Sequence, residues 1–362
     1  DKYSAVQTEQ SKRLGYWMDW DNSYYTMSDE NNYTIWGFLK KLFEKDKIYR
    51  GSDVVPWSGR SGTSYSQMEI IEGRKLVAHK AIFVRFPIRD RKNEYLLIWT
   101  TTPWTLPANL ALAVGEDIDY VFVDHAGETL ILAEALMEAV LGEGPHKVLQ
   151  RVKGTELVGL NYQRLFNYLE APGEICRVLP ADFVSTADGT GVVHVAPAYG
   201  VDDLALGQAY GLPVIHGVGL DGYFKEEVTP VAGKFFKDAD PVIIDLLRVR
   251  GLLFKAESYT HNYPFGWRTG DPLIYYAKNA WYIRTSAVRD RMVTLNQTIN
   301  WVPQTIRDGR FGNWLEHNVD WALSRERFWG TPLPLWTDGE GDFICIGSLA
   351  ELETLCGHSL KA

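Results

Sequence analysis

A threonine-rich turn at the end of an apolar run constrains this chain most strongly. Residues 95–99 (YLLIW) have the composition of a β-strand, and three threonines follow before Pro103 ends the strand pattern. Hydroxyl groups at the end of a strand lie at the rim of a sheet, where they donate and accept hydrogen bonds to ligands. The segment therefore predicts a binding site there. The alternative is that the threonines reflect only β-propensity and turn chemistry.

A second candidate segment spans residues 188–203 (DGTGVVHVAPAYGVDD). Its Gly-Thr-Gly sequence predicts a turn into a short strand that carries His194, and a helix is expected to begin near Asp202 or Asp203. A carboxylate in the first helical turn is stabilised by backbone N–H groups and the helix dipole, so we expect it to stay ionised and to bind an ammonium group. The alternatives are that one aspartate is only an N-cap and that His194 is a hydrogen-bonded core or rim histidine.

The pattern along the chain indicates more than one domain. Residues 28–47 carry an amphipathic stripe after Ser28, which predicts a capped packing helix. From about residue 68 to 258 the chain reads as short strands and turns, with hairpins expected over 120–132 and 214–224. Many short strands with few helices favour a closed or sandwiched β domain. The segments before and after it mix helices and strands, which indicates that the β domain is an insertion between two parts of another domain.

Composition excludes several classes of protein. The net charge of −9 argues against broad non-specific binding of nucleic acid, although a basic strip over residues 85–92 could contact a phosphate backbone or be a solvated loop. Three cysteines without a C-x-x-C pair argue against disulfides and a cysteine zinc site, which favours the cytoplasm. No apolar run approaches about 18 residues, so no membrane span is expected. The chain begins without Met and in mid-pattern, which indicates a fragment.

Three segments together resemble the isoleucyl-tRNA synthetases of class I, and the resemblance covers nearly the whole chain. Residues 100–109 (TTTPWTLPAN) are similar to the threonine-rich segment of their editing domain, and residues 189–203 to its partner segment. Residues 324–336 (SRERFWGTPLPLW) are similar to the segment where the chain rejoins the catalytic domain. The valyl and leucyl enzymes carry Arg where Thr102 stands and lack the Trp-Thr-Leu-Pro sequence, which favours the isoleucyl family.

The resemblance implies an α+β fold in which a β-barrel-like editing domain is inserted between two pieces of a Rossmann-type α/β catalytic domain. Residues 1–67 would be the end of the first Rossmann half and a connecting stem. Residues 68–258 would be the editing domain. Residues 259–362 would be the return stem and the start of the second Rossmann half.

The implied function is hydrolytic editing of mischarged Val-tRNA(Ile), and of valyl-adenylate. Valine lacks one methylene of isoleucine, and a pocket discriminates this by only about 1–3 kcal/mol, for which the isoleucyl enzyme is the standard example. A second site must therefore destroy the wrong product. The catalytic residues carried over by position are Thr100, Thr101 and Thr102, which would hydrogen-bond the terminal adenosine and the ester, and Asp203, which would hold the ammonium group. The substrate-binding residues are His194 and Trp104, which would narrow the pocket, and Asn109, a further polar residue.

The resemblance also says what this chain lacks. No nucleophile with a partner base is recognisable, which favours direct attack by a positioned water with help from a ribose hydroxyl of the substrate. The two ATP signatures of the family, His-x-Gly-His and Lys-Met-Ser-Lys-Ser, are absent. We therefore expect no cofactor for editing, with ATP and Mg serving the full-length ligase. Residues 57–62 (WSGRSG) and 266–269 (GWRT) replace the two C-x-x-C pairs that bind zinc in many relatives, so no metal is expected.

The implied partners are the acceptor end of tRNA(Ile) and a valyl-adenylate or valyl ester. No membrane is involved, and a cytoplasmic monomer is expected. One alternative is a non-catalytic module that binds the tRNA acceptor end. Another is the catalytic body of the ligase itself, against which the missing ATP signatures argue.

Overall fold

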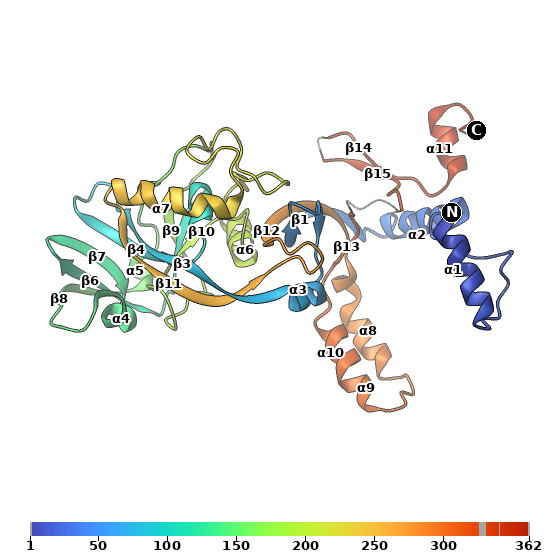
Figure 1. The fold of residues 1–362 in the computed structure, drawn as a ribbon, viewed down its shortest axis with the longest axis horizontal. Coiled ribbons are helices and arrows are strands. Elements are labelled where there is room, and N and C mark those ends of the chain that lie inside the picture. Colours follow the sequence, from blue (N-terminus) through green and yellow to red (C-terminus); the bar gives the residue numbers. More distant parts are fainter. Residues whose placement is uncertain (1, 326–330, 340, 361–362) are drawn as a thin grey trace. The chain divides into compact units, whose positions relative to one another are not determined.

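The computed structural model describes residues 2–325, 331–339 and 341–360, and it divides into two compact units. The first unit comprises Asp1–Arg50 and Trp281–Ala362, and the second comprises Gly51–Ala280. The limits between them fall inside strands β1 (Ile48–Ser58) and β12 (Ile274–Ile283) (Figure 1). The domain limits inferred from the resemblance stay a prediction.

A six-stranded sheet in the order β11-β3-β4-β7-β6-β8 dominates the second unit. Two long antiparallel strands, β3 and β11, are joined on one side by β4, whose last residue Thr100 lies opposite Ile82. The predicted hairpin over residues 120–132 is confirmed as β6 and β7. The bounds are β3 (Arg74–Pro87), β4 (Glu94–Thr100), β6 (Asp119–His125), β7 (Glu128–Ala133), β8 (Lys147–Lys153) and β11 (Leu253–Pro264).

A three-stranded sheet in the order β10-β5-β9 packs close to the first sheet. Its strands are β5 (Ala111–Val114), β9 (Arg177–Pro180) and β10 (Val192–Val195), and β10 also contacts β4. Apolar side chains from both sheets, such as Leu97 and Leu112, are fully buried in one core. Because this core extends beneath the ends of β4 and β10, it holds both candidate segments on rigid strands.

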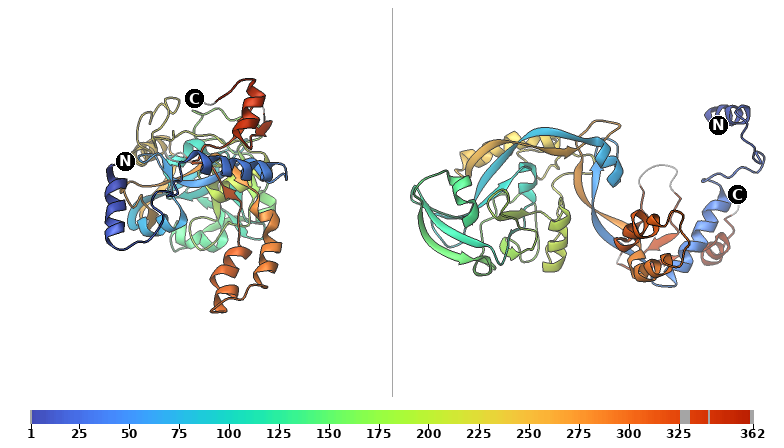
Figure 2. Two further views of the ribbon diagram at one scale, coloured as in Figure 1. Left: turned by 90° about the vertical axis from the view of Figure 1, so that its right-hand side faces the viewer. Right: turned by 90° about the horizontal axis from the view of Figure 1, so that it is seen from below.

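Short helices and loops complete the second unit (Figure 2). The hairpin expected over residues 214–224 forms only at its turn, where Val218 and Phe224 make an isolated antiparallel bridge, and the strand expected from Val214 does not form. The remaining elements of the unit are β2 (Thr63–Ser64), α3 (Gln67–Gly73), η1 (Pro103–Ala108), η2 (Glu134–Leu136), α4 (Met137–Leu141), α5 (Gly154–Leu157), α6 (Val201–Tyr210), η3 (Phe236–Ala239) and α7 (Asp240–Val249).

The first unit is built mainly of helices around a small apolar cluster of Leu39, Ile48, Ile283 and Cys345. The predicted capped helix is confirmed as α2 (Asp29–Phe43), where Ser28 Oγ accepts a hydrogen bond from the Asn31 backbone, although the helix ends earlier than residue 47. The other elements are α1 (Lys2–Arg13), η4 (Thr285–Val288), α8 (Arg289–Asn296), α9 (Thr305–Asp308), α10 (Arg310–Glu316), β13 (Trp321–Ala322), β14 (Leu335–Thr337), β15 (Phe343–Cys345) and α11 (Leu349–Cys356).

The α+β class is confirmed by this mixture of helices and sheets. In the described residues the six-stranded sheet is open, with β11 and β8 as its edges, so the barrel-like domain is not a closed barrel. Within the same residues, no helix is both long and apolar enough to cross a membrane.

Candidate active site

A cavity of about 440 Å³ lies in the second unit where β4 and β10 end. The two candidate segments supply most of its lining, although they are about ninety residues apart in the chain. Thr100, Thr101 and Thr102 contribute from the end of β4, and His194 and Asp203 contribute from the second segment. The structure thus brings five of the seven predicted site residues together around one space.

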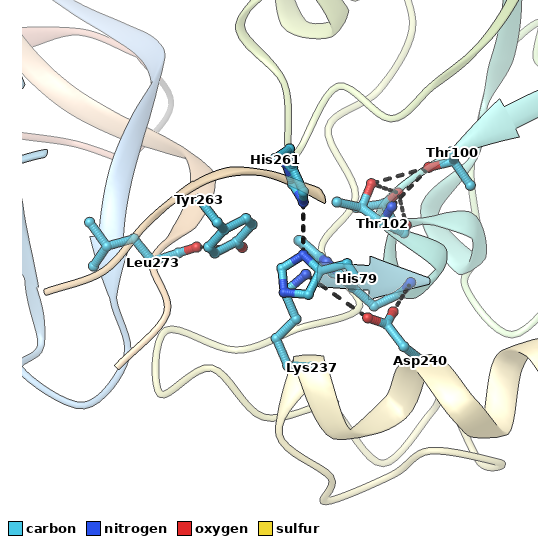
Figure 3. A network of polar contacts seen from close by, with 10 residues as sticks. His79, Thr100, Thr102, Lys237, Asp240, His261, Tyr263 and Leu273 are labelled. Atoms are coloured by element: carbon cyan, nitrogen blue, oxygen red, sulfur yellow. Dashed lines mark hydrogen bonds and ion pairs between the residues drawn. The ribbon is translucent and has the colours of Figure 1, made fainter. Parts of the chain in front are cut away.

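The threonine-rich turn presents its hydroxyl groups in a fixed arrangement. The Oγ1 atom of Thr100 accepts a hydrogen bond from the backbone N–H of Thr102 at 3.1 Å, and the two hydroxyl oxygens lie 3.3 Å apart (Figure 3). Thr101 also lines the cavity, and its hydroxyl has no hydrogen-bond partner within the described part of the chain. The Thr101 hydroxyl is therefore available to a ligand.

The Gly-Thr-Gly turn requires both of its glycines. Gly189 and Gly191 have φ values of +80° and +74°, a backbone conformation that side chains with a Cβ rarely adopt. A Cβ at Gly191 would lie 2.4 Å from the Cβ of Ala133 at the end of β7. Between the glycines, the carbonyl of Thr190 accepts a hydrogen bond from the Ala133 backbone at 2.8 Å. The predicted turn is confirmed, and it fixes where β10 begins.

Both ring nitrogens of His194 have protein partners. Nε2 lies 2.7 Å from Thr105 Oγ1, and Nδ1 lies 3.3 Å from the amide nitrogen of Asn109. Thr105 donates its own hydroxyl proton to the carbonyl of Thr102 at 2.8 Å, so it must accept from Nε2–H. Asn109 Nδ2 can only donate, so Nδ1 must accept. These contacts define the tautomer of His194 with the proton on Nε2.

The environment of His194 keeps the ring neutral. Burial lowers its pKa from the ordinary value of 6.5 to about 4, because a charged imidazolium would lose its hydration. A neutral ring with both nitrogens engaged has no free lone pair for proton abstraction. His194 therefore serves as a wall of the cavity and as a hydrogen-bond donor to Thr105.

Asp203 is the only predicted site residue whose electrostatics differ from expectation. The helix α6 is capped by Gly200, so neither aspartate is its N-cap, and Asp203 Oδ2 accepts a hydrogen bond from Ala196 N at 2.9 Å. The expectation that this carboxylate stays ionised through the helix dipole is wrong at mildly acidic pH. Burial raises its pKa from 3.8 to about 6, because desolvation outweighs the backbone hydrogen bond.

No ion pair compensates the Asp203 carboxylate within the described part of the chain. A ligand ammonium group placed beside it would supply the missing charge. Such a cation would favour the ionised carboxylate and lower its pKa. Asp203 is therefore electrostatically suited to a cationic ligand group.

Trp104 and Asn109 lie behind the cavity wall and do not line it. The Trp104 ring is buried against Tyr199 and Phe236, with ring centroids 4.9 Å away in both cases. Asn109 is fully buried and reaches the cavity only through His194. Tyr199 lines the cavity but was not predicted, because nothing in the local sequence distinguishes it from a core tyrosine.

A second polar cluster supports the start of η1 (Figure 3). The Asp240 carboxylate accepts a hydrogen bond from the Trp104 backbone at 2.9 Å, and Lys237 Nζ lies 3.9 Å from its other oxygen. Nearby, His79 Nδ1 and His261 Nε2 lie 2.9 Å apart. Sequence reasoning missed Asp240, since its link to η1 is made only by the fold. Asp240 thereby holds the backbone that directly follows the threonine turn.

The segments that stand in place of the C-x-x-C pairs meet around one buried carboxylate. Ser58 Oγ donates to Asp271 Oδ2 at 2.6 Å, and the Thr269 hydroxyl donates to Oδ1 of the same side chain. Asp271 is only 6% exposed. Among the described residues, no group of three or more His, Cys, Asp and Glu could hold a metal ion. These hydrogen-bonded hydroxyls do not fit a zinc site, and the expected lack of a metal stays a prediction.

The basic strip over residues 85–92 is partly neutralised. Arg85 Nε pairs with Glu128 at 3.0 Å, and Arg91 pairs with Glu94 at 3.2 Å. These contacts favour the interpretation of the strip as a structural and solvated loop over its use as a phosphate-binding surface.

The sequence that builds this fold and cavity is matched by a known family. A family model described as tRNA synthetases class I (I, L, M and V) matches residues 1–359. The chain therefore belongs to the class I tRNA synthetases of this group.

The curated relatives indicate which member of the group it resembles. Isoleucine–tRNA ligases are 46% identical in Clostridium novyi, 44% in Thermobifida fusca and 45% in Bdellovibrio bacteriovorus, over 97%, 98% and 99% of this chain. The resemblance to isoleucyl-tRNA synthetases is thus confirmed. The chain spans only 34%, 34% and 35% of those relatives, about a third of their length.

Two solved structures are also similar in part. The editing domain of a P. knowlesi cytosolic leucyl-tRNA synthetase covers 52% of this chain and 99% of its own, at 14% identity and a TM-score of 0.40. The structure named GlLeuRS-CP1 covers 49% of this chain and 99% of its own, at 16% identity and a TM-score of 0.39.

In the third resembling segment, residues 326–330 lie outside the described part of the chain.

Proposed function

We propose that this chain hydrolyses valine esters of tRNA(Ile), and valyl-adenylate, in the cavity between β4 and β10. The observation that carries the proposal is the composition of the two facing walls. One wall offers the hydroxyls of Thr100, Thr101 and Thr102, and the other offers the uncompensated carboxylate of Asp203. An aminoacyl ester of adenosine has an ammonium group, a carbonyl and ribose hydroxyls, which are the groups these walls can bind.

Each wall has a distinct role in the proposed reaction. Asp203 binds the ammonium group and so places the ester carbonyl near the threonine hydroxyls, which stabilise the negative charge that develops on the carbonyl oxygen. A water oxygen bonds to the carbonyl carbon, the ester C–O bond breaks, and one water proton passes to the departing ribose oxygen. Because His194 has no free nitrogen lone pair, a substrate ribose hydroxyl rather than this ring assists the water.

Selection by size is the role proposed for His194. The His194 ring lines the cavity. It accepts a hydrogen bond from Asn109 and donates one to Thr105, so the ring has little freedom to move away from a larger side chain. The extra methylene of isoleucine would then be excluded sterically, while valine fits. Trp104 acts from behind this wall, through its packing on Tyr199.

The proposal is tested by incubating this chain with Val-tRNA(Ile) and with Ile-tRNA(Ile) at high protein concentration and following loss of the ester. We expect faster loss of valine than of isoleucine, and no acceleration by the Asp203→Ala variant. If the chain binds the tRNA but both esters decay at the uncatalysed rate, the non-catalytic acceptor-end module is the correct function. The ligase reaction with ATP and Mg, and the tRNA(Ile) partner, are proposed for the full-length protein.

A further inference from the structure

A continuous chain of buried hydrogen bonds runs from Tyr162 to the cavity. The Tyr162 hydroxyl donates to Asn109 Oδ1 at 2.6 Å, and Asn109 Nδ2 contacts His194 Nδ1 at 3.3 Å. His194 Nε2 then reaches Thr105, which donates to the Thr102 carbonyl. Tyr162 and Asn109 are both fully buried. The chain therefore connects a residue remote from the cavity to the threonine turn that lines it.

The direction of every hydrogen bond in this chain is determined by Asn109. Its Nδ2 donates one proton to the Ala111 carbonyl at 2.9 Å, which leaves the second proton for His194. Its Oδ1 is then the atom that faces the Tyr162 hydroxyl. Reversal of the amide would place two oxygens against each other at Ala111 and would leave a donor facing Tyr162.

We propose that Tyr162 is a positioning residue for the cavity, which together with the Ala111 carbonyl holds the amide of Asn109 and thereby the ring of His194 in its Nε2–H form. The consequence for the reaction rests on the proposed editing function, because only there does the His194 wall discriminate between substrates. The positioning itself is a property of the fold. With the proton on Nε2, His194 donates to Thr105, and Thr105 in turn holds the carbonyl of Thr102.

Removal of the Tyr162 hydroxyl upsets this balance. In Tyr162→Phe, Asn109 Oδ1 becomes a buried acceptor without a donor, and such a group costs more than one neutral hydrogen bond contributes. The Ala111 carbonyl still accepts from Nδ2 and keeps the amide from reversing, so Oδ1 can regain a donor only if the Asn109 side chain shifts, which loosens its contact with His194 Nδ1. The ring of the variant remains, so its edge contact with Phe86 is kept.

The test is ¹⁵N NMR of the histidine rings in the full chain, with the His194 signals assigned by their loss in His194→Gln. In the unsubstituted chain we expect Nδ1 in the range of an unprotonated ring nitrogen and Nε2 in the range of a protonated one. In Tyr162→Phe we expect the Nδ1 signal to shift because its hydrogen bond from Asn109 is loosened, while the ring keeps its proton on Nε2. The control is Tyr263→Phe, which also loses a buried hydroxyl, bonded to the Leu273 carbonyl, and should leave His194 unchanged.

A second variant reverses the tautomer by design. Asn109→Asp, measured at a pH where the new carboxyl is ionised, has only acceptor oxygens at this position, so His194 must carry a proton on Nδ1. Unprotonated Nδ1 in this variant, protonated Nδ1 in the unsubstituted chain, or unchanged His194 signals in Tyr162→Phe would each overturn the assignment.

A kinetic measurement links this positioning to the proposed function. If Tyr162→Phe makes the His194 ring more mobile, the ratio of valyl to isoleucyl ester hydrolysis should fall about tenfold. A change of this size lies within the discrimination that one methylene provides. An unchanged ratio despite a shifted His194 Nδ1 signal would overturn the role of Tyr162 in selectivity. Should the unsubstituted chain hydrolyse neither ester while the NMR shifts occur, the proposed function fails and the positioning stands.

Discussion

His194 Nε2 lies 2.7 Å from Thr105 Oγ1, and this contact joins the two segments that form the cavity. Thr105 belongs to η1, directly after the threonine turn, while His194 lies on β10 of the other sheet. The two candidate segments therefore meet through a buried polar contact between η1 and β10. Because this hydrogen bond links the two segments, a substitution of either His194 or Thr105 should alter the cavity lining on both of them.

Replacement of His194 by alanine should let isoleucine esters into the site. The change removes a ring from the cavity lining, and we expect hydrolysis of Ile-tRNA(Ile) to rise at least about tenfold relative to Val-tRNA(Ile). Parallel deacylation assays of the two esters measure this. His317→Ala, an exposed histidine of the first unit, is the control and should keep the original selectivity. Continued rejection of isoleucine by His194→Ala would mean that other walls set the size.

Replacement of Asp203 by asparagine should separate stability from activity. The folded chain raises the pKa of this carboxyl from 3.8 to about 6, so the free energy of unfolding falls as the pH rises from about 4 to 6. The neutral amide escapes this cost, and we expect it to stabilise the fold at pH 7 to 8 by up to about 3 kcal/mol, at about 1.36 kcal/mol per pKa unit.

At pH 4 the carboxyl of the unsubstituted chain is itself largely neutral, so the gain in Asp203→Asn should shrink there. Thermal unfolding at both pH values measures the difference. Hydrolysis should be lost in the variant at every pH, and in the unsubstituted chain it should decline below about pH 6. An equal Tm difference at both pH values would contradict the raised pKa.

Replacement of Gly191 by alanine should destabilise the cavity. The new Cβ would lie 2.4 Å from that of Ala133, at a φ of +74°, and we expect a loss of at least about 1–3 kcal/mol in the free energy of unfolding. Gly127→Ala is matched in φ, at +85°, but has open space around the new Cβ, so it carries only the backbone strain. Denaturant unfolding of both variants should show the larger loss in Gly191→Ala.

Chelation should leave this chain unaffected. The Asp271 carboxylate accepts hydrogen bonds from Ser58 and Thr269, and these hydroxyls are weak zinc ligands. We therefore expect EDTA to leave the Tm unchanged, whereas Asp271→Ala should cost about 1–3 kcal/mol by leaving the buried Ser58 hydroxyl without its acceptor. A fall in Tm on chelation would show that a metal is bound after all.

The local sequence predicted the parts of the site that follow from local chemistry. Three hydroxyls at the end of a strand, a turn that requires glycine, and a carboxylate in the first turn of a helix are all found where they were expected. Their convergence on one cavity was inferred only from the family resemblance, since nothing in either segment specifies the other.

Other features depend on tertiary burial and could not be predicted. Helix position alone favours an ionised Asp203, yet the surrounding protein removes enough water to raise its pKa. Asn109 reads as a polar pocket residue but lies one layer behind His194, because its side chain is bonded to Ala111 and Tyr162. Tyr162 carries no sequence signal at all, and only the packed structure reveals its hydroxyl as part of the site.

A structure of this chain with a non-hydrolysable valyl-adenosine analogue tests the account most directly. The account predicts the ammonium group at hydrogen-bond distance from the Asp203 carboxylate, about 2.7–2.9 Å. It also places the valine side chain against His194 and the ribose beside Thr100 to Thr102. An analogue bound elsewhere, or bound in this cavity with its ammonium group away from Asp203, would contradict it.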